Sequence, residues 1–88
     1  MAVWGLDVQQ VRQLGSQLGN QAESIQQILT SLTSSLNGTQ WTGPDSEQFR
    51  NEWASTHTPA LRNVISALND ASAKARLNAD AQESTSAS

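Results

Sequence analysis

The segment NGTQWTGPD, residues 37–45, interrupts a chain whose remaining residues follow helical patterns. Gly38 is typical of a helix end, where glycine adopts the left-handed conformation more easily than other residues. Pro44 suits the first position of a new helix, because its missing N–H has no helical partner there. The segment therefore predicts a turn over residues 38–43 that sends the chain back along itself.

The residues before this turn predict one long helix over residues 8–37. Asp7 is a suitable N-cap, because its carboxylate can accept from the first free backbone amides. Apolar side chains then recur at steps of three and four, the spacing of one helical face. Gly15 and Gly19 share a face and indicate either surface tolerance or the close approach of a neighbouring helix. The expected apolar contact residues here are Val11, Leu14, Leu18, Ile25, Ile28, Leu29, Leu32 and Leu36.

The residues after the turn predict a second helix over about residues 44–80. Pro59 removes one backbone hydrogen bond, so we expect a kink or a split nearby. We favour a kink, since the apolar pattern resumes in phase at Leu61. Residues 84–88 are small and polar and predict a flexible tail. The expected apolar contact residues of the second helix are Phe49, Trp53, Leu61, Val64 and Leu68.

The chain has room for one domain, an all-α hairpin over residues 1–83, but little material for its core. It has 88 residues, of which 36% are hydrophobic and 5% aromatic. A hairpin of this kind gains about as much from burial as it loses in chain entropy. The first helix also has a wider apolar face than one neighbouring helix covers. We therefore expect a partner chain, in an obligate pair that buries about 2,000 Å² or more.

The composition also argues against several classes of function. The net charge is −3 with five basic residues and no basic stripe, which predicts no nucleic-acid binding. The chain has no cysteine and one histidine, His57, which we expect near the inner face in a structural role. No residue pattern indicates a catalytic, metal or cofactor site, so we predict a protein that is not an enzyme.

The N-terminal residues lack the charge and apolar run of a signal peptide. The apolar runs are also too short to cross a bilayer, so we expect no stable membrane insertion. If the protein leaves the cell, a route other than the general secretory one must carry it.

The Trp41-Thr42-Gly43 turn between two helices, with Phe49 and Trp53 after it, resembles the WXG100 family. These ESAT-like proteins are small helical-hairpin substrates of bacterial type VII secretion, and the resemblance covers nearly the whole chain. It implies a hairpin that dimerises into an antiparallel four-helix bundle and is exported folded by a membrane-bound secretion ATPase. It also implies a protein that is cytoplasmic before export and then secreted without a cleavable signal peptide.

In this family, the Trp-x-Gly turn forms one half of an export signal, which assigns that role to Trp41 and Gly43. The other half is a Tyr-x-x-x-Asp/Glu element near the C-terminus of the partner chain. This chain has no tyrosine, and its nearest match is Ala79-x-x-x-Glu83. The departure favours a heterodimer with a paralogous WXG100 protein that carries the tyrosine, with a homodimer as the alternative.

Other interpretations remain open from the sequence alone. Trp41 can serve only to cover the apolar ends of the helices, and Gly43 only to avoid a steric clash in the turn. The first functional hypothesis is an export partner or chaperone for a paralogous protein. A membrane-active secreted effector is the alternative, although little basic charge supports it. A third is a filament-forming hairpin, whose usual turn is rich in proline and lacks Trp-x-Gly.

Overall fold

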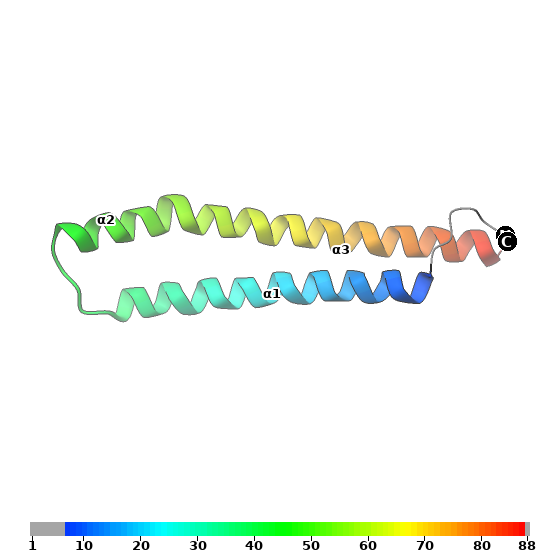
Figure 1. Ribbon diagram of the computed structural model, residues 1–88, viewed down its shortest axis with the longest axis horizontal. Helices are drawn as coiled ribbons and strands as arrows, with labels where there is room; N and C mark the ends of the chain where they lie inside the picture. Colours follow the sequence, from blue (N-terminus) through cyan, green and yellow to red (C-terminus); the bar gives the residue numbers. More distant parts are fainter. Residues whose placement is uncertain (1–6, 88) are drawn as a thin grey trace.

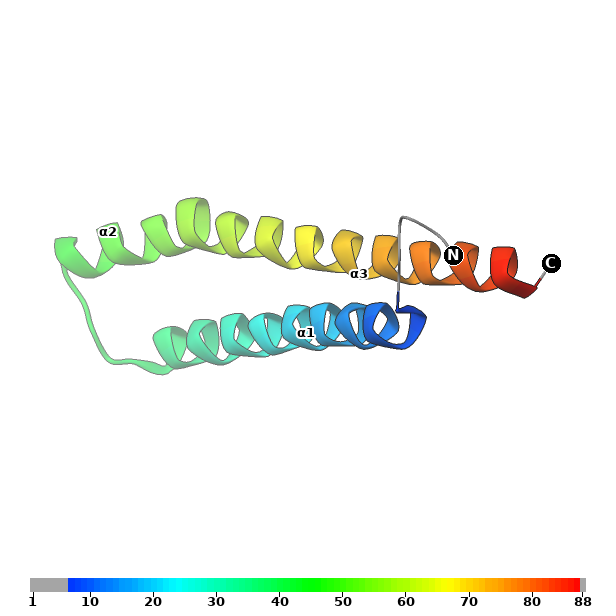
Figure 2. The same cartoon turned by 45° about the vertical axis from the view of Figure 1, so that its right-hand side comes forward.

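The computed structural model describes residues 7–87, with side chains for 7–84, as an antiparallel helical hairpin (Figure 1). Its elements are α1 (Val8–Gly38), α2 (Pro44–Glu52), a π-helical segment η1 (Trp53–His57) and α3 (Thr58–Ala87). The last three follow one another without a break and form the second arm, which runs beside α1 (Figure 2). The prediction of an all-α hairpin is confirmed, and α1 ends one residue later than the expected residue 37.

Helix α1 begins as expected and ends differently from the expectation. The carboxylate of Asp7 accepts a hydrogen bond from the backbone N–H of Gln10 at 3.0 Å, which confirms the N-cap. At the other end, Thr39 adopts an extended conformation, and its N–H donates to the Leu36 carbonyl. The expectation of a left-handed Gly38 is wrong, since Gly43 is the one described glycine with positive φ.

Pro59 perturbs the second arm without dividing it. A proline at this position cannot donate to the carbonyl of Ser55, four residues earlier. The chain forms the π-helical segment just before it, in which the Thr58 N–H donates to the Trp53 carbonyl five residues back. The ribbon widens at this yellow-green segment (Figure 2). The expected irregularity thus takes the form of a π turn within a continuous arm.

The second arm also extends further than expected. Helix α3 reaches Ala87 rather than ending near residue 80, so all but the last residue of the expected tail is helical. Residues 1–6 of the expected domain, and Ser88 of the expected tail, lie outside the described residues.

Small residues bring α1 and α3 close together. The Ser72 hydroxyl donates to the Gly15 carbonyl at 2.6 Å. A Cβ atom added at Gly15 would lie 3.3 Å from both the Ser72 carbonyl oxygen and Arg76 Cγ, tighter than most such contacts. Of the two interpretations of the paired glycines, close helix approach is therefore confirmed. The buried apolar residues between the arms are Ala22, Leu29, Ala75 and Ala79.

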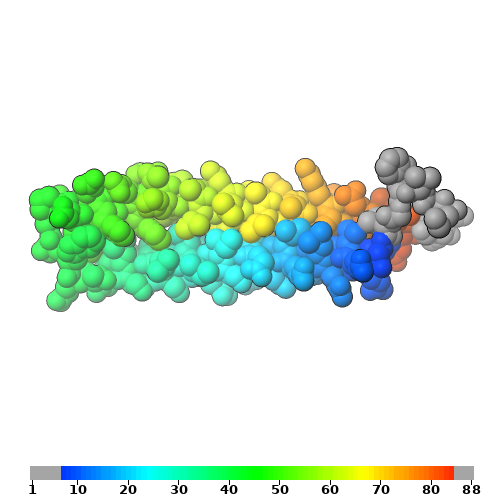
Figure 3. All heavy atoms as spheres, viewed as in Figure 1, coloured from blue at the N-terminus to red at the C-terminus, as the bar shows by residue number. Residues whose placement is uncertain are grey.

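The hairpin is a long rod in which the two helical arms lie side by side (Figure 3). It measures 66 × 18 × 15 Å, and its radius of gyration is 19.6 Å, whereas a compact domain of this length has about 12 Å. Its accessible surface is 6679 Å², against about 5,000 Å² for a compact protein of the same mass. Among the described residues, no large side chain is fully buried. The single chain thus has almost no core, and many of its large apolar side chains stay exposed.

Replacement of the two glycines beside the turn, Gly38 and Gly43, tests its backbone geometry. Gly43 has φ 115° and ψ 175°, a backbone conformation that is unfavourable for residues other than glycine. Gly38 ends α1 without positive φ and with open space around it. We expect Gly43→Ala to lower the free energy of unfolding by about 1–3 kcal/mol. Gly38→Ala should raise it by about 0.5 kcal/mol. Urea denaturation at one fixed protein concentration measures both, and equal effects would contradict the assigned turn.

Candidate functional site: the apolar face and the turn

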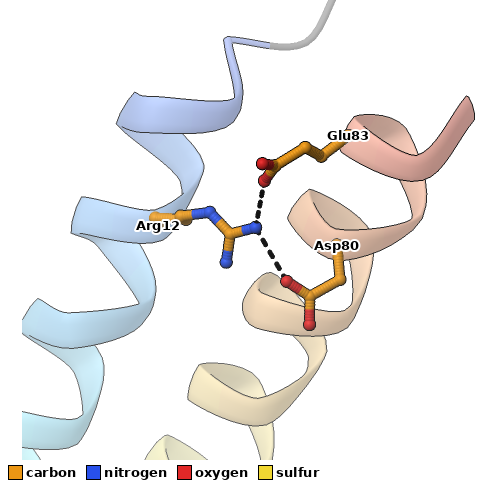
Figure 4. A network of polar contacts seen from close by, with 3 residues as sticks. All are labelled: Arg12, Asp80 and Glu83. Atoms are coloured by element: carbon orange, nitrogen blue, oxygen red, sulfur yellow. Dashed lines mark hydrogen bonds and ion pairs between the residues drawn. The ribbon is translucent and has the colours of Figure 1, made fainter. Parts of the chain in front are cut away.

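The flat hairpin has two broad faces, and charged residues mark one of them. Arg12 of α1 pairs across the helix interface with Asp80, at 2.8 Å, and with Glu83 (Figure 4). Hydrogen bonds to Glu83 first, and then to Asp80, raise the pKa of Arg12 above its ordinary value. Arg62 lies about five helical turns from Asp80 and therefore on the same side of α3. The side that carries these four residues is called the polar face below.

The two positions of the degenerate C-terminal signal lie inside this arrangement. Ala79 is 0% exposed, enclosed at the contact between α3 and α1. Glu83, four residues later, is held by Arg12. An aromatic side chain at position 79 would therefore have to displace α1. Sequence reasoning did not identify Arg12 or Asp80, because their pairing depends on the register between the two arms.

Large apolar side chains gather on the opposite side of the contact between the arms. On α1, Leu14 and Leu32 are both about half exposed and lie about five turns apart, so they share one side of the helix. Ile28, which is 54% exposed, lies one turn before Leu32 on the same side. On α3, Val64 belongs to a stripe of alanines at steps of four, three and four residues. The apolar face consists of Leu14, Leu18, Ile28, Leu32, Ala60, Val64, Ala67 and Ala71.

The thirteen residues expected to form apolar contacts fall into three groups of burial. Leu29 alone is buried, at 3% exposure. Seven are half-buried beside the contact between the arms: Val11, Leu18, Ile25, Leu36, Trp53, Leu61 and Leu68. Five stay exposed on the single chain: Leu14, Ile28, Leu32, Phe49 and Val64. The expected apolar surface is thus present, but the hairpin covers only part of it.

The turn presents a second apolar feature, a pair of aromatic rings. The rings of Trp41 and Phe49 are 5.4 Å apart between centroids and tilted by 57°. Both side chains are exposed. Phe49 also lines a groove of about 220 Å³ together with Leu32 and Trp53. This groove joins the aromatic pair of the turn to the apolar face.

Arg50 holds the turn, a role that the sequence did not reveal. Its guanidinium donates to the carbonyls of Leu36, at 2.9 Å, and Thr39, at 3.1 Å. These are carbonyls at the end of α1, where a cation is also favoured by the helix dipole. Its Nε donates to the hydroxyl of Ser46, which in turn donates to the carbonyl of Trp41 at 2.8 Å. One side chain therefore fixes the helix end and the backbone of the Trp-x-Gly segment.

The polar face carries a wider groove of about 850 Å³, bordered mainly by hydroxyl and amide side chains. Trp53 is one of the residues that line this groove, and its Nε1–H donates to the Thr33 hydroxyl at 3.0 Å. His57 was expected near the inner face, but it is exposed, with its ring centroid 6.2 Å from that of Trp53. The π turn explains this difference, because it rotates the following residues relative to a regular helix.

Two other kinds of site are absent from the described residues. Residues 7–84 contain no group of three or more side chains suited to holding a metal ion. None of the described helices has the length and hydropathy needed to cross a bilayer.

Comparison with protein-family profiles, with characterised proteins and with solved structures found no match to this chain.

Replacement of Arg50 tests its role in the turn. We expect Arg50→Ala to lower the free energy of unfolding by about 1–2 kcal/mol, because carbonyls at the end of α1 lose their charged donor. Amide hydrogen exchange over residues 36–46 should become faster. Arg62→Ala is the matched control, since Arg62 makes no hydrogen bond or ion pair seen within residues 7–84, and it should change stability by less than about 0.5 kcal/mol. Equal effects of the two variants would contradict the assigned role.

Proposed function

We propose that this chain is a secreted helical hairpin of the WXG100 type, exported as a folded pair by a type VII secretion system. In this role it acts as the export partner of a second hairpin. The observation that carries the proposal is the exposed apolar face of a hairpin that is otherwise fully formed. A protein that works alone rarely leaves such a face in contact with water.

The dimensions of the chain support pairing with another hairpin. The accessible surface exceeds that of a compact protein of this mass by roughly a third. The exposed apolar side chains of this face run along much of the rod, where a second rod of the same length could cover them. Two such layers form a four-helix bundle, the arrangement in which amphipathic hairpins of this size bury their apolar sides.

The geometry of the turn supports a role in export. Trp41 is exposed beside Phe49 at the end of the rod. The Ser46 hydroxyl donates a hydrogen bond to the Trp41 carbonyl, and Arg50 donates in turn to that hydroxyl. These hydrogen bonds fix the backbone that carries the indole ring. An aromatic side chain on a rigid element loses little entropy on binding and is well suited to recognition. The resemblance to WXG100 proteins assigns this Trp-x-Gly segment to the export signal.

The C-terminal arm supports a division of labour between the two chains. Ala79 is enclosed and Glu83 is paired within the hairpin, so neither is displayed for recognition. The partner's C-terminal arm would then supply the tyrosine-bearing element next to this chain's turn. A paralogous WXG100 protein is the partner that this reasoning favours, and a second copy of the chain is the alternative.

Export of Trp41→Ala tests the signal. We expect the variant to keep its helical circular dichroism and to form pairs, while its appearance in the culture medium falls at least about tenfold. Leu77→Ala is the control, since Leu77 is 67% exposed and lies outside both the turn and the apolar face. Deletion of the secretion ATPase should abolish export of the unmodified chain. Undiminished secretion in that deletion strain would refute the proposed route.

A charge on the apolar face tests pairing. We expect Ile28→Lys to weaken association at least about tenfold, because a lysine would be buried without a partner charge. Leu77→Lys makes the same change at an exposed leucine away from the face and should leave association unchanged. Sedimentation velocity over a concentration series measures the association of each variant. The series is run on each variant alone, or on each variant mixed with the partner hairpin if the pair is a heterodimer. Equal association of the two variants would show that another surface mediates pairing.

A further inference from the structure

We propose that the groove on the polar face binds an uncharged carbohydrate chain. This groove of about 850 Å³ lies between the half of α1 nearest the turn and the part of the second arm around the π-helical segment. It belongs neither to the apolar face nor to the aromatic pair of the turn. The inference does not rest on the proposed export function, and a hairpin that covers the apolar face leaves the polar face open.

The groove is long and follows the axis of the rod. Its lining on α1 extends from Gln26 to Asn37, which is about 16 Å at the rise of a helix. On the second arm the lining extends from Trp53 to Asn63, which is about 15 Å. A linear ligand made of several units therefore fits the groove better than one small, round molecule.

Both walls of the groove come from stretches of the chain with little charge. Residues 24–44 contain no Asp, Glu, Lys or Arg, and neither do residues 53–61. Among the described residues that line the groove, Arg62 is the only charged one, and its side chain is exposed. A single exposed guanidinium contributes little to the affinity for an ion in water. The lining therefore favours a ligand without charge.

The lining is rich in groups that both donate and accept hydrogen bonds. Its hydroxyl and amide side chains come from both arms: Gln26, Thr30, Thr33, Ser34, Asn37, Thr58 and Asn63. Within residues 7–84, four of these form no side-chain hydrogen bond: Ser34, Asn37, Thr58 and Asn63. A hydroxyl or amide group can act as donor and as acceptor at once. Sugar hydroxyls have the same double capacity, so the two walls are matched to a sugar chain between them.

Trp53 supplies an aromatic surface among these polar groups. Its Nε1–H donates to the Thr33 hydroxyl on the other arm at 3.0 Å, which holds the indole across the gap between the arms. The half-buried indole lines this groove and also the small groove beside Phe49. The face of an aromatic ring is negative, so the slightly positive C–H groups of a sugar ring pack favourably against it. A fixed ring with convergent polar groups is the combination that orients a small polar ligand.

A peptide is the other linear polar chain, and the lining suits it less well. Peptides bind in grooves largely through apolar anchor side chains that sit in pockets. Apart from Trp53, the apolar residues of the lining are Leu29, Ala54 and Pro59. Leu29 is only 3% exposed, and the other two are compact. The groove therefore offers hydrogen bonds along its length but no deep apolar pocket for an anchor.

The π turn is a second indication of a binding site. Ala54 lies in the π-helical segment, and Thr58 and Pro59 follow it directly. Single π turns are rare in helices and occur frequently at functional sites. The widened part of the second arm thus forms one wall of the groove.

Titration of the full, isotope-labelled chain with neutral tetrasaccharides tests the inference by NMR. The probes are cellotetraose, maltotetraose and tetra-N-acetylchitotetraose, which differ in linkage and substituents. At least one of them, in the low millimolar range, should shift the Trp53 Nε1–H signal and the side-chain amide signals of Asn37 and Asn63. The indole signal of Trp41, which lies at the turn outside the groove, should stay unchanged.

Variants on both walls locate the bound sugar. Asn37→Ala and Asn63→Ala should each weaken binding about fivefold, because each removes hydrogen bonds to the ligand. Asn78→Ala is the matched control, since Asn78 is an exposed asparagine of α3 outside the groove, and its affinity should equal that of the unmodified chain. Circular dichroism checks that each variant is folded. Equal affinities of Asn63→Ala and Asn78→Ala would overturn the inference.

Other ligands separate carbohydrate recognition from its alternatives. Unchanged groove signals with all three tetrasaccharides would overturn the inference. So would equally strong shifts from a pentapeptide of alternating glycine and serine, which would show a peptide site. Binding of tetragalacturonate at least about tenfold more tightly than the neutral sugars, and its loss in Arg62→Ala, would show an anion site instead.

Discussion

The close approach of α1 and α3 at Gly15 and Ser72 is the constraint on which the rest of the structure depends. With only a glycine and a serine at this crossing, the backbones come near enough for a side-chain-to-carbonyl hydrogen bond of 2.6 Å. The contact between the arms then has room for alanines and a single buried leucine. Large apolar side chains must lie beside this contact rather than within it. They form a face that the hairpin cannot cover by itself.

The turn shows how a short segment can be rigid without a core around it. Gly43 supplies a backbone conformation that other residues disfavour, and Pro44 starts the next helix. Arg50 then connects the end of α1, the hydroxyl of Ser46 and, through it, the Trp41 backbone. The aromatic pair is therefore displayed by a network of polar contacts that lies behind it. Such a support explains how an exposed tryptophan can keep a defined position.

The sequence predicted the fold well and the polar contacts poorly. Asp7 and the helical spacing predicted the bounds of α1 to within one residue. Pro44 predicted the start of the second arm. These signals are local in the chain, so they can be recognised without knowing the register between the arms. Arg12 and Arg50 were missed, since their partners lie on the other arm or beyond the turn and depend on register. Ala79 was interpreted through a family motif, whereas its burial follows from its place opposite α1. His57 was misplaced because the π turn at Trp53–His57 shifts the helical phase.

We propose that the hairpin reaches its full stability only when a second hairpin covers its apolar face. Thermal unfolding over a range from about 1 to about 100 µM tests this directly, because the stability of a paired protein depends on its concentration. We expect a melting temperature that rises with the concentration of the hairpin or of its partner. A monomer that unfolds cooperatively at one melting temperature throughout this range would contradict it.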